Sequence, residues 1–198
     1  MAEPVMERRE AIRRVVGMLG GVALVGSSGL LVACGRERSS AVPIGTFSVA
    51  DITLLDEIAE GIIPATDTPG AQAAQCGAFM ALMVTDAYKP EDATIFRTGL
   101  GTLDEAVRAA GGTTFMAAPA ELRTRVLEAL DAEQHAAMKD APSNTPRHWF
   151  RMVKELVLTG YFTSEIGMTQ ALRYVEAPGR FDPCVPYVDG EKTWAPHA

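Results

Sequence analysis

The sequence predicts an all-α protein, a single compact bundle of five or six helices followed by an irregular, proline-rich C-terminal tail. Three observations support this fold class. Apolar residues recur at spacings of three and four over most of residues 47–177, which places them on single helix faces. No segment alternates apolar and polar residues as a half-buried strand does. Residues 177–198 contain four prolines and little periodicity, which predicts extended chain packed on the helices or on another protein.

Capping and proline residues delimit the first two helices. Ser48 and Asp51 lie three residues apart and form an N-terminal capping pair, so a helix is expected to start there. Pro64 ends that helix, and a turn-rich segment follows. A second helix is expected over about residues 71–88. The apolar residues expected to be buried are Ile52, Leu55, Ile58 and Ile62 in the first helix, and Cys76, Phe79, Leu82 and Met83 in the second.

Prolines also mark the starts of the third and fourth helices. The third runs from Pro90 to Ala110, and Gly99 and Gly101 weaken its middle enough to allow a break. The fourth covers residues 118–138. Their expected apolar faces are Ile95, Leu100, Leu103 and Val107, and then Leu122, Val126 and Leu130.

The stretch TGYFTSEIG, residues 159–167, predicts the junction of the last two helices. The fifth helix is expected over residues 147–160, and Thr163 or Ser164 caps a sixth that runs to residues 177–179. Their expected apolar faces are Trp149, Phe150, Val153, Leu156, Val157 and Gly160, and then Met168, Leu172 and Val175.

Small and aromatic residues at this junction suggest shape rather than chemistry. Gly160 is expected to end or kink the fifth helix, and Gly167 to permit close approach of another helix or of a partner. Aromatic residues dominate the energetics of protein interfaces, and the alternative for each of them is burial in the core. The candidate interface residues are Trp149, Tyr161, Phe162 and Trp194.

Residues 1–33 have the composition of an export signal. The basic segment contains Arg8 and Arg9, and residues 15–33 carry no charge, with five glycines and two serines among them. This combination resembles a twin-arginine (Tat) signal, which handles folded cargo. An uncleaved membrane anchor is the alternative, because nineteen residues can cross a bilayer, but the glycines and serines make a weak spanning helix.

The signal ends in a segment, LVACG, that resembles a bacterial lipobox. Leu31, Ala33 and Cys34 occupy its expected positions, so Cys34 is expected to be lipidated after cleavage. Residues 34–46 then form a polar tether, and residues 47–198 form the helical domain. The chain is expected on the periplasmic side of a bacterial membrane, attached through its lipid.

The remaining cysteines, Cys76 and Cys184, form a candidate disulfide, since an oxidising compartment favours pairing. Two alternatives stay open: one or both are small buried residues, or one bonds a partner chain.

The net charge of the chain restricts its possible partners. The whole chain has a net charge of −7, and removal of residues 1–33 leaves 14 basic and 22 acidic residues, a net charge of −8. This acidic balance argues against nucleic-acid binding.

Patterns for catalysis or cofactor binding are absent from the sequence. His135, His148 and His197 do not have metal-ligand spacing, and no C-x-x-C-H, P-loop or G-x-S-x-G motif occurs. The acidic pairs Asp56–Glu57 and Asp104–Glu105 are expected on solvated helix faces. The sequence therefore predicts a non-catalytic chain that holds no cofactor or metal of its own.

Two segments resemble the gluconate 2-dehydrogenase subunit 3 family: ADITLLDEIAEGIIPATDTPGA near the start of the domain and LVLTGYFTSEIGMTQALRYVEAPGRFDPC near its end. The resemblance spans roughly residues 47–195. It implies a small subunit that supports the export, folding and stability of a large flavoprotein of the glucose–methanol–choline type, which binds FAD. It also allows for a multihaem cytochrome c subunit that contains haem c.

These observations lead to two hypotheses. The first is the small subunit of a membrane-associated periplasmic, FAD-dependent dehydrogenase acting on sugars or polyols such as gluconate. The alternative is a free-standing periplasmic lipoprotein that binds another envelope protein or a ligand, which Cys34 and the acidic domain also permit.

Overall fold

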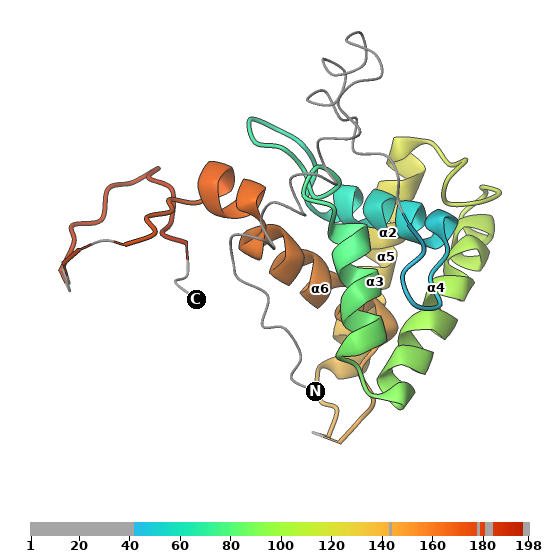
Figure 1. Cartoon of the computed structure of the whole chain (residues 1–198). Helices are drawn as coiled ribbons and strands as arrows, with labels where there is room; N and C mark the ends of the chain where they lie inside the picture. Colours follow the sequence, from blue (N-terminus) through green and yellow to red (C-terminus); the bar gives the residue numbers. More distant parts are fainter. Residues whose placement is uncertain (1–41, 143, 178, 181–183, 196–198) are drawn as a thin grey trace, which may run out of the picture. The chain divides into compact units, whose positions relative to one another are not determined.

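Helices make up all the regular structure in the part of the chain described by the computed structural model, residues 42–142, 144–177, 179–180 and 184–195 (Figure 1). Within these residues, pairing of extended chain is limited to two isolated bridges, Ile44 with Phe47 and Arg173 with Trp194. The all-α prediction is confirmed, with six helical elements. They are α2 (Val49–Ile62), α3 (Cys76–Asp86), α4 (Pro90–Ala109), α5 (Ala120–Met138), α6 (Trp149–Thr163) and a short π-helix, η1 (Gly167–Ala171).

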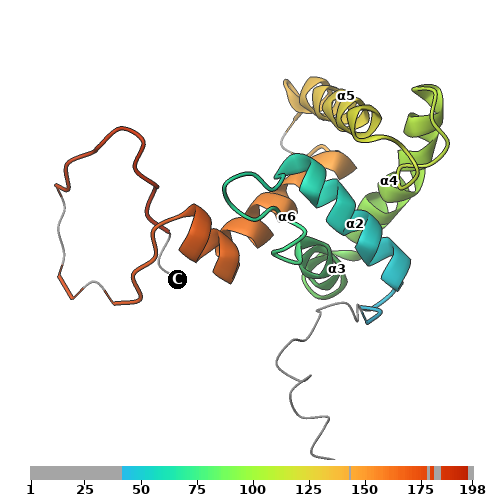
Figure 2. The same ribbon diagram turned by 90° about the horizontal axis from the view of Figure 1, so that it is seen from above.

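Helix α6 is the central element of the bundle. It contacts α2, α3, α4, α5 and η1, and Figure 2 shows it between α5 and α3. A helix surrounded in this way must be apolar over most of its circumference. The sequence of α6 meets this need, because its buried residues are Trp149, Phe150, Met152, Val153, Leu156, Val157, Gly160 and Tyr161.

The start of α2 follows the prediction. The Ser48 hydroxyl accepts a hydrogen bond from the Asp51 N–H at 3.2 Å, and the Asp51 carboxylate accepts one from the Ser48 N–H at 2.8 Å. The chain just before it is already folded, because Ile44 packs against the core and the Arg97 guanidinium donates to the Thr46 hydroxyl at 2.7 Å. The last residues of the predicted tether, Ile44–Thr46, therefore belong to the domain.

Helix α3 differs from the prediction in its start and in its buried face. It begins at Cys76, about five residues late, because residues 71–75 form turns and Gln75 has a positive φ of 58°. Leu82, expected in the core, is exposed. The segment CGAFMALMV is apolar at almost every position, so periodicity could not select the inward face. The buried residues are Cys76, Gly77, Met80, Ala81 and Val84.

The last two helices also end at other residues than expected. Helix α6 continues through Gly160 to Thr163, so Gly160 neither ends nor breaks it. A Cβ atom at Gly160 would come within 2.6 Å of Phe79 Cδ1, so this glycine allows α3 and α6 to approach closely. The final element ends at Ala171, because Leu172 is extended and leads into the bridge between Arg173 and Trp194. Ser164 ends α6, and its hydroxyl accepts a hydrogen bond from the N–H of Gly167, the first residue of η1, at 3.0 Å.

Helix α4 runs unbroken through Gly99 and Gly101, which have different environments. A Cβ atom at Gly99 would overlap the Trp149 side chain, whereas one at Gly101 would meet nothing within 4 Å. Gly99 therefore provides the space that the first residue of α6 fills.

These two glycines form a matched pair for mutagenesis. Gly99→Ala should lower the free energy of unfolding by roughly 1–3 kcal/mol, because it forces Trp149 out of place. Gly101→Ala should raise that free energy by about 0.5–1 kcal/mol, through helix propensity alone. Urea unfolding of both variants, followed by circular dichroism, checks the difference. Equal stabilisation by both substitutions would contradict the proposed packing.

Candidate functional site

Carboxylates on α2 hold the loop that joins it to α3. The Glu60 carboxylate accepts hydrogen bonds from the Ala65 N–H at 2.8 Å and from the Gln72 N–H at 2.9 Å. The Asp56 carboxylate accepts from the Gly77 N–H at 2.6 Å. Hydrogen bonds from N–H groups to a charged acceptor are stronger than those between neutral groups. The loop containing IIPATDTPGA is therefore fixed by α2 through its own backbone.

The other acidic residues predicted to be solvated also have structural partners. Glu57 lies 2.5 Å from Arg123 Nη1, which joins α2 to α5. Asp104 accepts from the Phe115 N–H at 2.8 Å and so fixes the turn that follows α4. The prediction that these pairs lie on solvated faces was wrong for Asp56, Glu57 and Asp104, because each accepts a hydrogen bond from a specific donor. Glu105 is exposed, as predicted.

The second segment that carries the family resemblance meets this loop. The Tyr161 hydroxyl donates a hydrogen bond to the Pro69 carbonyl at 2.8 Å, across 92 residues of sequence. A Cβ atom at Gly167 would overlap the Tyr161 carbonyl oxygen, so η1 packs directly on the last turn of α6. The two segments therefore form one structural unit, with the exposed Phe162 and the loop residues Thr66 and Asp67 at its surface.

The four aromatic residues predicted as an interface divide into two groups. Trp149 and Tyr161 are buried in the core, at 8% and 2% exposure, so for these two the alternative of core packing holds. Phe162 and Trp194 are exposed, at 36% and 47%, and stay candidates for contact with a partner. Tyr161 and Phe162 differ because they are neighbours on α6, where Tyr161 points into the bundle and Phe162 points outward.

The predicted disulfide does not form in the structure. Cys76 is buried in the first turn of α3, where its sulfur lies 4.0 Å from the Val157 carbonyl oxygen. Cys184 is exposed on the C-terminal segment. Burial, together with the nearby charges of Asp56 and Glu60, raises the pKa of the Cys76 thiol to about 12. Cys76 therefore behaves as a small core residue, and the thiolate needed for disulfide chemistry is strongly disfavoured.

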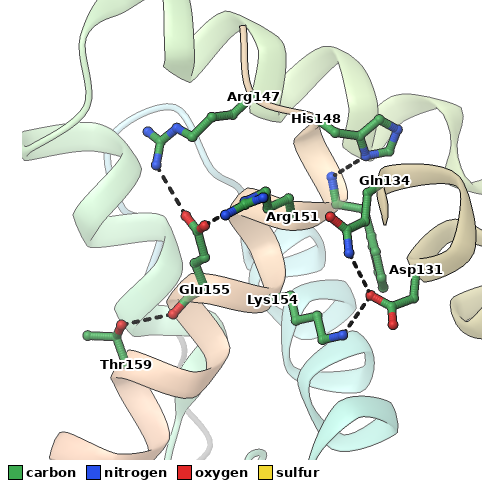
Figure 3. A network of polar contacts seen from close by, with 9 residues as sticks. Asp131, Gln134, Arg147, His148, Arg151, Lys154, Glu155 and Thr159 are labelled. Atoms are coloured by element: carbon green, nitrogen blue, oxygen red, sulfur yellow. Dashed lines mark hydrogen bonds and ion pairs between the residues drawn. The ribbon is translucent and has the colours of Figure 1, made fainter. Parts of the chain in front are cut away.

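A polar network joins α5 to the start of α6 (Figure 3). Lys154 Nζ lies 2.6 Å from the Asp131 carboxylate, and this hydrogen bond lowers the pKa of Asp131. The Glu155 carboxylate pairs with Arg147 at 3.2 Å and with Arg151 at 2.9 Å. His148 caps α6, because its Nδ1 accepts from the backbone N–H of the residue two positions on, at 3.2 Å. These charged groups satisfy one another and stabilise the bundle.

A shallow hollow of about 330 Å³ lies between α2 and α4. Its lining residues are Asp51, Leu54, Arg97, Leu100, Gly101 and Asp104. The three charged residues already have partners within the chain: Ser48, Thr46 and the Phe115 N–H, respectively.

Neither a metal site nor a membrane-spanning helix occurs in the part of the chain that the structure describes. Among the described residues, no group of three or more His, Cys, Asp or Glu side chains is placed to hold a metal ion. None of the helices in that part of the chain combines the length and apolar content needed to cross a bilayer. Arg8, Arg9 and Cys34, predicted as signal and lipidation residues, lie outside the described residues.

A family model described as gluconate 2-dehydrogenase subunit 3 matches residues 50–179. The chain belongs to this family. The match includes the loop after α2 and the junction of α6 with η1, so it covers the unit formed by the two resembling segments. It ends before Cys184 and Trp194, and so covers less of the tail than the resemblance suggested. No curated protein and no solved structure matches the chain.

The Glu60 carboxylate can be tested by Glu60→Gln. An amide has one acceptor oxygen and no charge, so one of the two loop N–H groups loses its acceptor. Unfolding should become easier by about 1 kcal/mol, and amide exchange at Ala65 or Gln72 should accelerate. Glu128→Gln, on the exposed side of α5, should change neither quantity. Unchanged exchange in Glu60→Gln would show that the loop does not depend on this side chain.

The pH dependence of Asp56 provides a second test. Burial raises the pKa of Asp56, and the charge of Glu57 adds to this, although the hydrogen bond from Gly77 opposes it. A raised pKa in the folded state gives stability that is present below the unfolded pKa and is lost as pH rises through the folded value. Asp56→Asn keeps the acceptor oxygen, so it should gain stability relative to wild type as pH rises from about 3.5 to about 7.

The opposite sign is expected for Asp131→Asn, because the pKa of Asp131 is lowered. Wild type should lose its advantage over Asp131→Asn as pH falls from about 5 to below about 3, through the unfolded pKa and then the lower folded pKa. Urea midpoints measured across the pH series check both signs. A constant difference between wild type and Asp56→Asn at every pH would contradict a raised pKa of Asp56.

Proposed function

We propose that this chain is the non-catalytic small subunit of a membrane-associated periplasmic, FAD-dependent dehydrogenase that oxidises gluconate or a related sugar or polyol. The family match over residues 50–179 carries this proposal, because the family is described as a subunit of gluconate 2-dehydrogenase. The described charged groups add support. Asp56, Glu57 and Asp131 each pair with a backbone N–H or a basic side chain of a neighbouring helix, an arrangement suited to holding a shape.

The proposed role is to support the export, folding and stability of the large subunit. A Tat-like signal on this chain carries folded cargo, so one signal can serve two chains that bind before translocation. Binding to the native large subunit also shifts that protein's folding equilibrium toward the native state by mass action. Lipid on Cys34 would then keep the complex at the periplasmic side of the membrane.

The redox chemistry is assigned to the partners. In this proposal FAD resides in a large subunit of the glucose–methanol–choline type, and haem c resides in a multihaem cytochrome c subunit where one is present. The small subunit contributes binding surface, for which the exposed Phe162 and Trp194 are available.

Coexpression tests the proposal directly. The large subunit should reach the periplasm and oxidise its substrate only when this chain is present, and substitution of Arg8 and Arg9 by Lys in this chain should stop its export. Cell fractionation and dye-linked dehydrogenase activity measure both effects. If the flavoprotein is exported and active equally well without this chain, the proposal fails. Purification of this chain as a monomer without a flavoprotein would favour the free-standing lipoprotein instead.

A further inference from the structure

The chain closes on itself after η1. The Arg173 N–H donates to the Thr193 carbonyl at 2.9 Å, and the Ala195 N–H donates to the Arg173 carbonyl at 2.8 Å. The Arg173 guanidinium lies 4.3 Å from the centre of the Trp194 ring and 3.0 Å from the Glu191 carboxylate. Lys192 donates to the Gln170 carbonyl. We call the described residues 173–177 and 184–195 the C-terminal arm, which Figures 1 and 2 both show following η1.

The arm exposes several large apolar side chains. Its six large exposed apolar residues range from 38% to 83% exposure, and Tyr187 is the most exposed. Given typical side-chain areas, they present on the order of 500 Å² to solvent. This area is within the range of about 300–600 Å² for the largest apolar patch on a typical monomer, a patch that is often functional. It is also more than half of the about 800 Å² that a standard interface takes from each partner. The residues are Tyr174, Val175, Val185, Tyr187, Val188 and Trp194.

We propose that the C-terminal arm is a docking element that seats in an apolar groove of the large flavoprotein subunit. This inference rests on the proposed function. Tyrosine and tryptophan supply much contact area while losing little rotamer freedom, and a polar rim around them is typical of interfaces. Asp189, Glu191 and Lys192 provide that rim.

Charge favours a protein partner over a lipid surface. Among residues 184–195 the two carboxylates outnumber the single lysine, whereas anionic membranes attract basic segments. The whole chain is also acidic, at −7, so the complementary groove has neutral or basic edges. The contacts at Arg173 hold the two ends of the arm together before binding, which lowers the entropy lost on docking.

The test compares two double variants of the full chain, each coexpressed with the large subunit. Tyr187→Ala with Val188→Ala removes arm side chains, and Val49→Ala with Leu82→Ala removes exposed apolar side chains from α2 and α3. The arm variant should bind the large subunit at least about tenfold more weakly, and the control should bind as wild type does. Without the large subunit, the full chain carrying the two arm substitutions should melt at the wild-type temperature, because Tyr187 and Val188 lie outside the core.

Several outcomes would overturn the inference. The first is that wild type binds the large subunit and the arm variant binds it with the same affinity. Another is a wild-type homodimer that the arm variant cannot form. A third is flotation with phosphatidylglycerol-containing vesicles that the arm substitutions abolish, measured in a Cys34→Ala background so that lipid on Cys34 cannot hold the chain. If wild type itself does not bind the large subunit, the proposed function fails, and this inference fails because it depends on that function.

Discussion

The close approach of helices to α6 is the constraint on which the rest of the fold depends. Trp149 at its start occupies the space left by Gly99 of α4, and Phe79 of α3 packs where Gly160 has no side chain. At its end, η1 rests on the last turn because Gly167 also lacks a Cβ atom. At Gly99 and Gly160 an aromatic side chain packs on the glycine backbone, and at Gly167 another backbone does, each more closely than a larger residue would allow. The remaining helices then find their apolar partners on a helix that is buried over most of its surface.

Once α6 is fixed, polar contacts of the long loop after α2 determine its shape. Glu60 supplies acceptors for two of its backbone N–H groups, and Tyr161 supplies a donor for the Pro69 carbonyl. Asp56 accepts from the Gly77 N–H in the first turn of α3, where the loop ends. The residues that make the family segments recognisable are therefore mainly structural. In this account the surface for a partner lies on side chains that the core does not use, such as Phe162 and the apolar residues of the C-terminal arm.

The features of the fold that could be predicted from the sequence are those set by neighbouring residues, such as helix caps and apolar periodicity. The cap at Ser48 and most buried positions of α4 and α5 followed from residue type and periodicity. In the first turns of α4 the inward residue is Phe96, whereas Ile95, which was expected there, is only half-buried. The face of α3 could not be predicted, because its segment is apolar on all sides. Gly160 was misread because a glycine required by a neighbouring Phe79 looks the same in sequence as one that ends a helix. Likewise, nothing local distinguishes Asp56, whose donor lies on another helix, from a solvated carboxylate.

Amide hydrogen exchange of the chain, alone and bound to the large subunit, tests the central claim most directly. If the C-terminal arm docks on the large subunit, residues 184–195 gain protection, while Trp149 and Tyr161, already buried in the free chain, change little. Unchanged exchange in residues 184–195, with new protection confined to α4 and α5, would contradict it.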